Sequence, residues 1–190
     1  MTSERVEEAG GPADAAATGV TRLSVPGAVI ELRPHNCFAC GQLNVGGLHL
    51  ALHVDDRRCW TELSLPARFE GWEGIAHGGI LCTILDEVMA WALVERDDWG
   101  VTARLSVEFR RPVPIGQAIR AEGWITEGRR RVVHTAGRIV DAASGTELAT
   151  AEGLYVAAPE ARKRDLKQRY DFRLVRDPER VAREPEGARR

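Results

Sequence analysis

The sequence predicts an α+β domain in which one long helix packs on a face of an antiparallel sheet. The first observation is an apolar stretch with helical periodicity over residues 78–94, and the second is a run of strand-like segments over residues 101–157. Short turns at residues 128–130 and 143–145 separate these later segments and are typical of hairpins. One long helix followed by hairpin-linked strands favours an α+β fold with the helix on one sheet face.

The composition is that of a globular protein with one sizeable core. The chain has 190 residues, of which 44% are hydrophobic and 28% are charged. Its net charge of −2 lacks the basic excess expected of a nucleic-acid binder. The longest apolar run is interrupted by Asp86 and Glu87, and the acidic N-terminus has no apolar signal-peptide region. We therefore expect a cytoplasmic protein with no nucleic-acid and no membrane partner.

Three regions of the chain differ in composition. Residues 1–20 are rich in Ala, Gly and Glu without periodicity, and we expect them to form a disordered leader. Residues 21–158 are expected to form the folded domain, and residues 159–190 a charged C-terminal tail that is partly helical. Within this tail, residues 162–176 are predicted to form an exposed charged helix. We favour a solvated tail over a basic arm that meets phosphates or acidic partners.

The predicted elements of the folded region follow in a simple order. Residues 23–32 are mixed in character and indicate a short strand or a covering segment. Residues 48–54 and 59–65 alternate as a hairpin, and a loop rich in Gly then leads into the helix. Four strands are predicted after the helix, at residues 101–111, 117–127, 131–142 and 147–157.

The predicted helix carries two carboxylates, Asp86 and Glu87, in an otherwise apolar stretch. A buried and unpaired carboxylate costs free energy, so Asp86 is either exposed or held for a purpose. Helical geometry places Asp86 on one face with Gly79, Cys82, Thr83, Ala90 and Leu93. The broader apolar face, expected in the core, consists of Leu81, Leu85, Val88, Met89 and Ala92. Glu87 is rotated by about 100° from Asp86, and we expect it to point to solvent or to a dimer edge.

The start of the helix is suited to binding an oxygen that becomes negatively charged. Gly78 and Gly79 leave backbone N–H groups at the positive end of the helix dipole, and Gly allows a ligand to approach closely. Gly79 and Asp86 are seven residues apart, which is roughly 10 Å along the axis. Two such helices, paired antiparallel across a dimer axis, would bring the carboxylate of one chain to the glycines of the other.

These residues carry a resemblance to a known family. The segment HGGILCTILDE, in which an Asp lies nine residues after His77, resembles the hotdog-fold acyl-CoA thioesterases of the PaaI and THEM4-like group. Residues 35–44, which lead into Gly-Leu-His-Leu, are similar to the segment before the first long strand in THEM4-like members. Residues 101–112 are similar to the strand after the central helix. The similarity covers about residues 35–158 and implies a hotdog fold, an antiparallel sheet wrapped around one long central helix.

The resemblance implies hydrolysis of acyl-CoA thioesters in sites shared between the chains of a dimer or tetramer. The thioester carbonyl would accept hydrogen bonds from Gly78 or Gly79, and Asp86 of the partner subunit would act as base or nucleophile. Thr102 stands where similar enzymes place a Ser or Thr that holds the attacking water. The family often has Asn or Gln six residues before the His, whereas this chain has Gly71 there.

The substrate-binding candidates are basic or neighbour the glycines. His77 either binds substrate or braces the loop, and we favour a bracing hydrogen bond. Three consecutive arginines at a predicted hairpin tip could meet the phosphates of CoA, although a solvated turn is at least as good an interpretation. These are Arg129, Arg130 and Arg131. We expect no cofactor.

Cys37 and Cys40 form a CxxC sequence preceded by His35. A metal or redox site is one interpretation, but a structural zinc site needs four ligands and the chain has no second CxxC. The remaining candidates, which the spacing does not bring together, are His49, His53 and Cys59. We favour small buried cysteines in a turn closed by Gly41, with no metal.

Two other functions remain open from the sequence. The first is a hotdog module that binds acyl-CoA without turnover, against which the presence of both Asp86 and Thr102 argues. The second is a metal or redox protein built on the CxxC sequence, which bound zinc would favour. A hydratase is ranked low because no Asp–His pair of the kind found in hydratases is seen.

Overall fold

The computed structural model describes residues 21–25, 28–55, 57–96, 99–129 and 131–176. Within these residues nine strands form one sheet in the order β11-β2-β1-β3-β4-β8-β9-β10-β7. All its pairings are antiparallel except the one between β1 and β3, which is parallel. The predicted leader, residues 1–20, lies outside the described part of the chain.

The long half of the sheet follows the predicted strands closely. Its members are β4 (Cys59–Ser64), β7 (Gly100–Phe109), β8 (Ala118–Arg129), β9 (Val132–Asp141) and β10 (Glu147–Ala157). The short half consists of β1 (Thr21–Val25), β2 (Ala28–Leu32), β3 (Leu52–Val54) and β11 (Arg173–Arg176). A separate two-stranded sheet, β5 (Glu70–Trp72) with β6 (Ile75–Ala76), precedes the helix.

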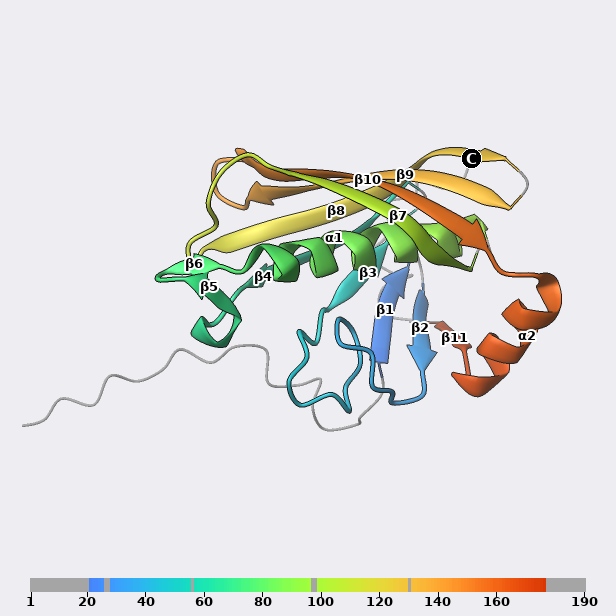
Figure 1. Ribbon diagram of the computed structural model, residues 1–190. Coiled ribbons are helices and arrows are strands. Elements are labelled where there is room, and N and C mark those ends of the chain that lie inside the picture. Colours follow the sequence, from blue (N-terminus) through green and yellow to red (C-terminus); the bar gives the residue numbers. More distant parts are fainter. Residues whose placement is uncertain (1–20, 26–27, 56, 97–98, 130, 177–190) are drawn as a thin grey trace, which may run out of the picture.

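The central helix α1 (Gly78–Ala92) lies between the long strands and the short ones, so that the sheet wraps around it (Figure 1). Its predicted apolar face is confirmed, because the side chains of that face are all buried: Leu81, Leu85, Val88, Met89 and Ala92. Short 3-10 turns flank the region, η1 (Ala67–Phe69) before the helix and η2 (Leu93–Arg96) after it. None of the described helices has the length and apolar character needed to span a bilayer.

Three glycines on adjacent strands let α1 approach the sheet closely. Gly123 on β8 faces Gly137 on β9 across the ladder, and Gly153 follows on β10. A Cβ on Gly123 would lie 2.7 Å from the backbone nitrogen of Met89, and one on Gly137 would lie 3.1 Å from the Met89 side chain. Because these glycines have no side chains, the sheet surface is depressed there, and the middle of the helix packs into this depression.

The C-terminal region differs from the prediction of one charged helix over residues 162–176. Helix α2 spans Glu160–Arg169 and ends there, and Asp171 adopts a positive φ of 47° before the chain returns as β11. β11 pairs antiparallel with β2, and Tyr170 and Phe172 pack on the core between them. The apolar residues that flank the turn favour this return over a longer solvated helix, which would leave them exposed.

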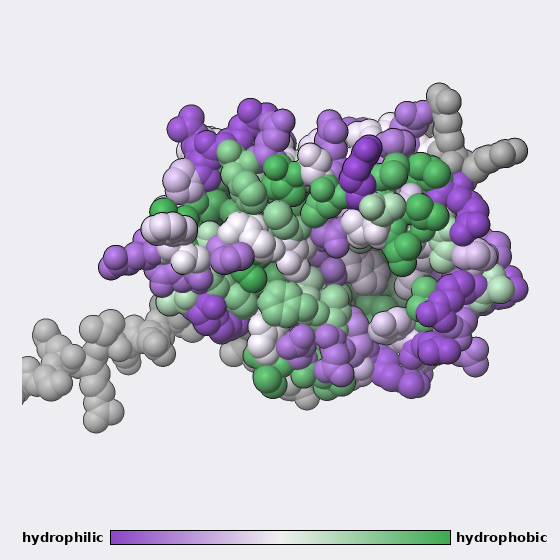
Figure 2. Space-filling view, in the orientation of Figure 1, coloured by the Kyte–Doolittle hydropathy of each residue, from purple (hydrophilic) through white to green (hydrophobic). Residues whose placement is uncertain are grey.

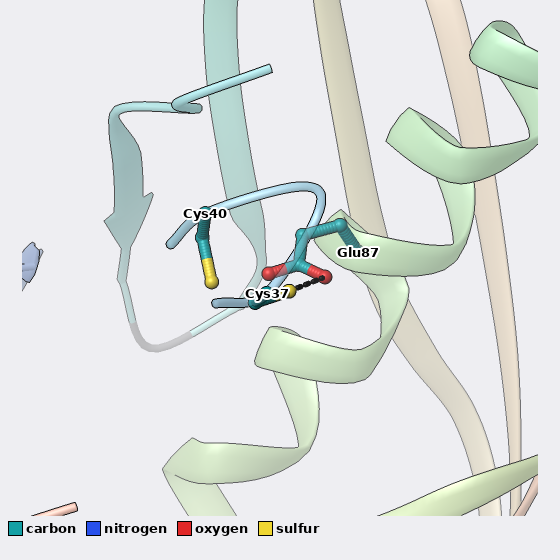
Figure 3. A group of neighbouring side chains, drawn as sticks. All are labelled: Cys37, Cys40 and Glu87. Atoms are coloured by element: carbon teal, nitrogen blue, oxygen red, sulfur yellow. Dashed lines mark hydrogen bonds between the residues drawn. The ribbon is translucent and has the colours of Figure 1, made fainter. Parts of the chain in front are cut away.

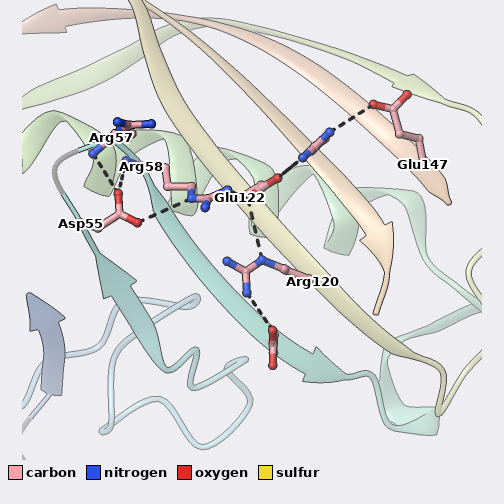
Figure 4. Close-up of polar contacts among 8 residues, drawn as sticks. Asp55, Arg57, Arg58, Arg120, Glu122 and Glu147 are labelled. Carbon is pink, nitrogen blue, oxygen red and sulfur yellow. Dashed lines mark hydrogen bonds and ion pairs between the residues drawn. The ribbon is translucent and has the colours of Figure 1, made fainter. Parts of the chain in front are cut away.

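The face of the sheet opposite α1 carries a charged network centred on Glu122 of β8 (Figure 4). This carboxylate is 3% exposed and accepts hydrogen bonds from Arg58 at 2.7 Å and Arg138 at 2.6 Å. Burial alone would raise the pKa of Glu122, but the hydrogen bonds and charges of Arg138 and Arg58 outweigh it and lower that pKa. Arg120 lies 3.8 Å away and also covers the ring of Trp60 at 4.0 Å. The network joins β4, β8 and β9 on the face away from the helix.

Candidate active site

The N-terminus of α1 is capped by the side chain of the residue before it. Nδ1 of His77 accepts a hydrogen bond from the N–H of Gly79 at 2.9 Å. The N–H of His77 itself donates to the carbonyl oxygen of Phe69 at 2.9 Å, which fixes the loop. His77 therefore braces the turn, and the amide of Gly79 is occupied. The N–H of Gly78 has no hydrogen-bond partner among the described residues and is the donor left for a ligand.

Gly71 has a steric reason to lack a side chain. A Cβ at this position would lie 2.9 Å from the Cα of His77 and 3.2 Å from its side chain. The loop and the helix start thus touch backbone to backbone, and the amide side chain that similar enzymes often carry here would not fit without a shift of the loop. The backbone of the helix start has to hold the carbonyl group instead.

A pocket of about 350 Å³ opens beside Gly78. Its wall is mainly apolar and its rim carries two arginines that the sequence interpretation passed over. The lining consists of Ile75, Ala76, Gly78, Leu81, Phe109, Arg110, Arg111, Pro112 and Val113. Arg110 pairs with Glu108 at 2.8 Å, and both side chains are at least half exposed. The Arg-Arg-Pro sequence at the end of a strand was the available signal, because Pro ends the ladder and leaves the preceding side chains at the sheet margin.

Asp86 lies further along the helix and accepts two hydroxyl hydrogen bonds at one oxygen. Thr102 of β7 donates to Oδ1 at 2.8 Å, and Tyr155 of β10 donates to the same Oδ1 at 2.7 Å. Tyr155 is fully buried, and its burial together with the charge of Asp86 raises the pKa of its hydroxyl above the usual range. The phenol stays protonated and donates, while Oδ2 of Asp86 has no partner among the residues described.

The sequence predicted Asp86 and Thr102 but not Tyr155. A β-bulge accounts for the way Thr102 reaches the helix. Tyr155 pairs with Thr102 while the neighbouring Leu154 pairs with Arg104, so Ala103 is an extra residue in β7. Such an extra residue bends the strand and redirects its side chains. The pairing of Tyr155 with Thr102 brings two hydroxyls to one carboxylate.

The sequence predicted that Glu87 points to solvent or to a dimer edge, whereas in the structure it points toward a loop of the same chain. It is partly buried and faces the CxxC loop, where Sγ of Cys37 lies 4.0 Å from Oε2 (Figure 3). Nε1 of Trp91 donates to Oε1 at 2.8 Å. Burial, followed by the charge of Cys37, raises the pKa of Glu87 to about 7. The rotation of about 100° between adjacent helical residues does separate the two carboxylates, but a loop distant in sequence covers this one.

The CxxC thiols are themselves perturbed. A hydrogen bond from Cys40 is the main cause that lowers the pKa of Cys37 to about 5, and the same interaction raises the pKa of Cys40 above its usual range. Cys40 is buried, as predicted, and Cys37 is half-buried. The loop therefore holds one acidic thiol next to one that keeps its proton.

The predicted arginine cluster is only partly visible. Arg130 and the side chain of Arg129 lie outside the described part of the structure. Nε of Arg131 donates to the carbonyl oxygen of Ala157 at 3.2 Å, which ties the β8–β9 turn to the end of β10. This interaction gives Arg131 a structural partner.

Within one chain, the predicted oxyanion donor at Gly78 is far from the predicted catalytic carboxylate of Asp86. Gly78 lies against the ring of Phe109, where a Cβ would be 3.3 Å away, whereas Asp86 lies against Thr102 near the other end of β7. At 1.5 Å per residue the two are about 12 Å apart along the helix. The donor and the carboxylate of a single chain cannot act on the same carbon atom.

A family model described as the thioesterase superfamily matches residues 73–147. The crystal structure of a thioesterase superfamily protein matches with a TM-score of 0.58 and 29% identity, over 61% of this chain and 60% of that one. The chain thus spans less than two thirds of that relative. No sequence among the curated proteins matches.

Two further solved structures share the fold. The PaaI protein of the phenylacetic acid degradation operon of E. coli matches with a TM-score of 0.51 and 18% identity, over 54% of this chain and 73% of that one. A hypothetical thioesterase from Streptococcus pneumoniae, solved with coenzyme A, matches with a TM-score of 0.52 and 17% identity, over 54% and 80% of the two chains. The match over residues 73–147 and these structures agree with the resemblance and confirm the fold class inferred from the sequence: the chain has a hotdog fold, and residues 73–147 are similar to the thioesterase superfamily.

Proposed function

We propose that this protein hydrolyses acyl-CoA thioesters to a free acid and CoA. The observation that carries the proposal is the carboxylate of Asp86, whose Oδ1 is held by the hydroxyls of Thr102 and Tyr155. Two donors fix the orientation of the side chain and leave Oδ2 for chemistry. Such a carboxylate, placed on the small-residue face of the helix, can take a proton from water or attack a carbonyl carbon itself.

The thioester carbonyl would bind at the start of α1. The N–H of Gly78 points from the positive end of the helix, and one such donor stabilises a developing oxyanion by roughly 3 kcal/mol. The acyl group would occupy the adjoining pocket, whose wall is apolar. Asp86 of the partner subunit would then act on the carbonyl carbon, with Thr102 also accepting a hydrogen bond from the attacking water.

This shared site requires a second copy of the chain. β7 is the last strand of the sheet order, and it carries exposed apolar side chains in the single chain, with Val101 at 70% and Phe109 at 54%. Hydrophobic surface runs along the side of the molecule that carries α1 and β7 (Figure 2). We propose that this side pairs with its copy in a dimer, or in a tetramer of two dimers, and that the pairing brings Gly78 of each chain to Asp86 of the other.

Solved variants of a similar protein support the choice of catalytic pair. Two variants of the Streptococcus pneumoniae thioesterase carry alanine in place of an aspartate and of a threonine. Those two positions are 16 residues apart, as Asp86 and Thr102 are here. The coenzyme A bound to that protein supports CoA as part of the substrate. We propose that Arg110 and Arg111 at the pocket rim meet the CoA phosphates, and Arg129, Arg130 and Arg131 remain candidates for the same role.

The test is hydrolysis of a panel of acyl-CoAs that covers short, long and aryl acyl groups. Loss of thioester absorbance is the better readout, because the four cysteines of the chain would react with a thiol reagent. We expect turnover of at least one class, and light scattering should show a dimer or tetramer at the assay concentration. Tight binding of acyl-CoA with no turnover would instead identify a non-catalytic acyl-CoA-binding module. An active monomer would exclude the shared site.

A further inference from the structure

The CxxC loop is fixed by its own backbone. The N–H of Gly41 donates to the carbonyl oxygen of Cys37 at 3.0 Å, and the N–H of Leu43 donates to that of His35 at 3.1 Å. A Cβ on Gly41 would lie 2.4 Å from both the nitrogen of Cys37 and the carbonyl oxygen of His35, so only Gly fits. The loop is therefore wound tightly, and both of its thiols lie on the side that faces α1 (Figure 3).

The thiols and the helix carboxylate converge on one point. The sulfur atoms of Cys37 and Cys40 and a carboxylate oxygen of Glu87 all lie within 4.8 Å of one another. Ligand atoms around a tetrahedral zinc ion, at about 2.0–2.3 Å from the metal, are about 3.3–3.8 Å apart. A contraction of about 1 Å would bring the three groups to coordination distance, which side-chain rotation can supply.

A bound cation would balance the negative charge of this cluster. Glu87 is partly buried and, within the described residues, takes part in no ion pair. Its partners are the indole N–H of Trp91 and the thiols of Cys37 and Cys40. An uncompensated carboxylate in such a place is costly. A divalent ion would neutralise it together with the thiolates, which bind metal in their deprotonated form.

His35 adjoins the three groups at Cys40 and would complete the set if its ring moved toward the other two. Its Nε2 lies 3.5 Å from the sulfur of Cys40, and its Nδ1 lies 3.2 Å from the carbonyl oxygen of Arg33. An Nδ1–H that donates to a backbone carbonyl places the lone pair on Nε2, the nitrogen next to Cys40, which is the outer-shell arrangement typical of metal-binding histidines. Two thiolates, an imidazole and a carboxylate are all ligand types that zinc accepts.

We propose that Cys37, Cys40, His35 and Glu87 form a structural zinc site that fastens the CxxC loop to α1. The sequence offered His49, His53 and Cys59 as further ligands, but the fold brings in a helix residue and the histidine before the loop instead. Glu87 directly follows Asp86 in α1. The ion would therefore anchor the helix one residue from the proposed catalytic carboxylate. The proposal does not depend on thioesterase activity.

The experiment measures zinc in the full-length protein purified without chelator. We expect one zinc ion per chain by elemental analysis, and a shift to lower unfolding temperature after its removal. The apo protein should take up Co²⁺ and develop thiolate-to-cobalt charge-transfer absorption, which reports sulfur ligands directly. Apo protein that binds neither Zn²⁺ nor Co²⁺ at micromolar concentration would overturn the proposal. A Cys37–Cys40 disulfide under reducing purification would do the same and indicate a redox pair.

Variants separate the four ligands from the other thiols. Cys37→Ser and Glu87→Gln should each weaken zinc affinity by at least about tenfold, since loss of an outer-shell partner alone costs about 10- to 100-fold. Cys82→Ser is the matched control, because Cys82 lies outside the cluster, and it should keep the full zinc content. If a ligand variant does not fold, the cobalt spectrum of the unmodified chain still decides the question. Full zinc content in Cys37→Ser would refute the assignment.

Discussion

Replacing Asp86 by Asn tests the catalytic proposal with little disturbance of the structure. Oδ1 of Asp86 accepts from Thr102 at 2.8 Å and from Tyr155 at 2.7 Å, and the amide oxygen of Asn can accept both bonds. The amide nitrogen then takes the place of Oδ2, the oxygen that would receive a proton or attack carbon. The variant therefore keeps shape and hydroxyl contacts and loses only basicity.

The expected loss in kcat for Asp86→Asn is at least about a hundredfold, which is the scale of general-base removal. This loss corresponds to about 2.7 kcal/mol of transition-state stabilisation, at 1.36 kcal/mol for each factor of ten. KM should change little, because the carboxylate acts in the transition state and not in ground-state binding. The assay is steady-state hydrolysis of the best acyl-CoA from the panel.

Two controls make the result on Asp86→Asn interpretable. The unfolding temperature and the oligomeric state of the variant should match those of the unmodified protein. Glu62→Gln applies the same chemical change to an exposed ion pair with Arg120, 57% exposed on the Glu side, and should leave kcat unchanged. Turnover near that of the unmodified protein by a folded Asp86→Asn oligomer would refute the reasoning and move the search to another group.

Three further predictions concern other parts of the molecule. Tyr155→Phe removes one of the two hydroxyls at the site carboxylate, so kcat should fall and stability should drop by about 1 kcal/mol, as measured by urea unfolding; unchanged kinetics would show that this hydroxyl is structural only. Gly123→Ala places a Cβ 2.7 Å from the nitrogen of Met89 and should destabilise by about 1–3 kcal/mol, whereas Gly46→Ala, with its nearest neighbour at 3.7 Å, should stay within about 0.5 kcal/mol. The pKa of Glu122 is lowered in the folded state, because its arginine partners outweigh burial. The ionised carboxylate therefore contributes to the free energy of unfolding above its unfolded pKa, and this contribution is lost as pH falls through the folded pKa. Urea unfolding of Glu122→Gln between pH 6 and 3 should therefore show a weaker loss of stability on acidification than the parent, and an equal loss would contradict this.

The hydrophobic periodicity of the sequence correctly predicted the elements whose structure depends on local sequence. The apolar face of α1 and the four strands after it follow from alternation and turn residues alone, because each pattern matches the period of its element. The position of Asp86 on a small-residue face follows in the same way. The same geometry separates Asp86 from Glu87, since adjacent helical side chains diverge by about 100°.

The features that the sequence did not predict depend on contacts between segments that are distant in the chain. Glu87 is covered because the loop that begins at His35 packs over α1, and no local pattern indicates that contact. Tyr155 looks like an ordinary inward strand residue, and only its pairing across the bulge with Thr102 brings its hydroxyl to Asp86. The residues of β11 lie in the stretch that the sequence predicted as an exposed charged helix. They form a strand because the backbone groups along the outer edge of β2 are available to pair with them.

That pairing of β11 with β2 has a consequence for how the chain can be shortened or tagged. β2 lies one strand in from the end of the sheet, and β11 satisfies its outer row of backbone N–H and C=O groups. A truncation after Tyr170 would uncover this row on a strand whose residues are Ala, Val, Ile, Glu and Leu. An open edge of that composition is a template for adding strands of other molecules, so the charged C-terminal segment protects the protein against aggregation.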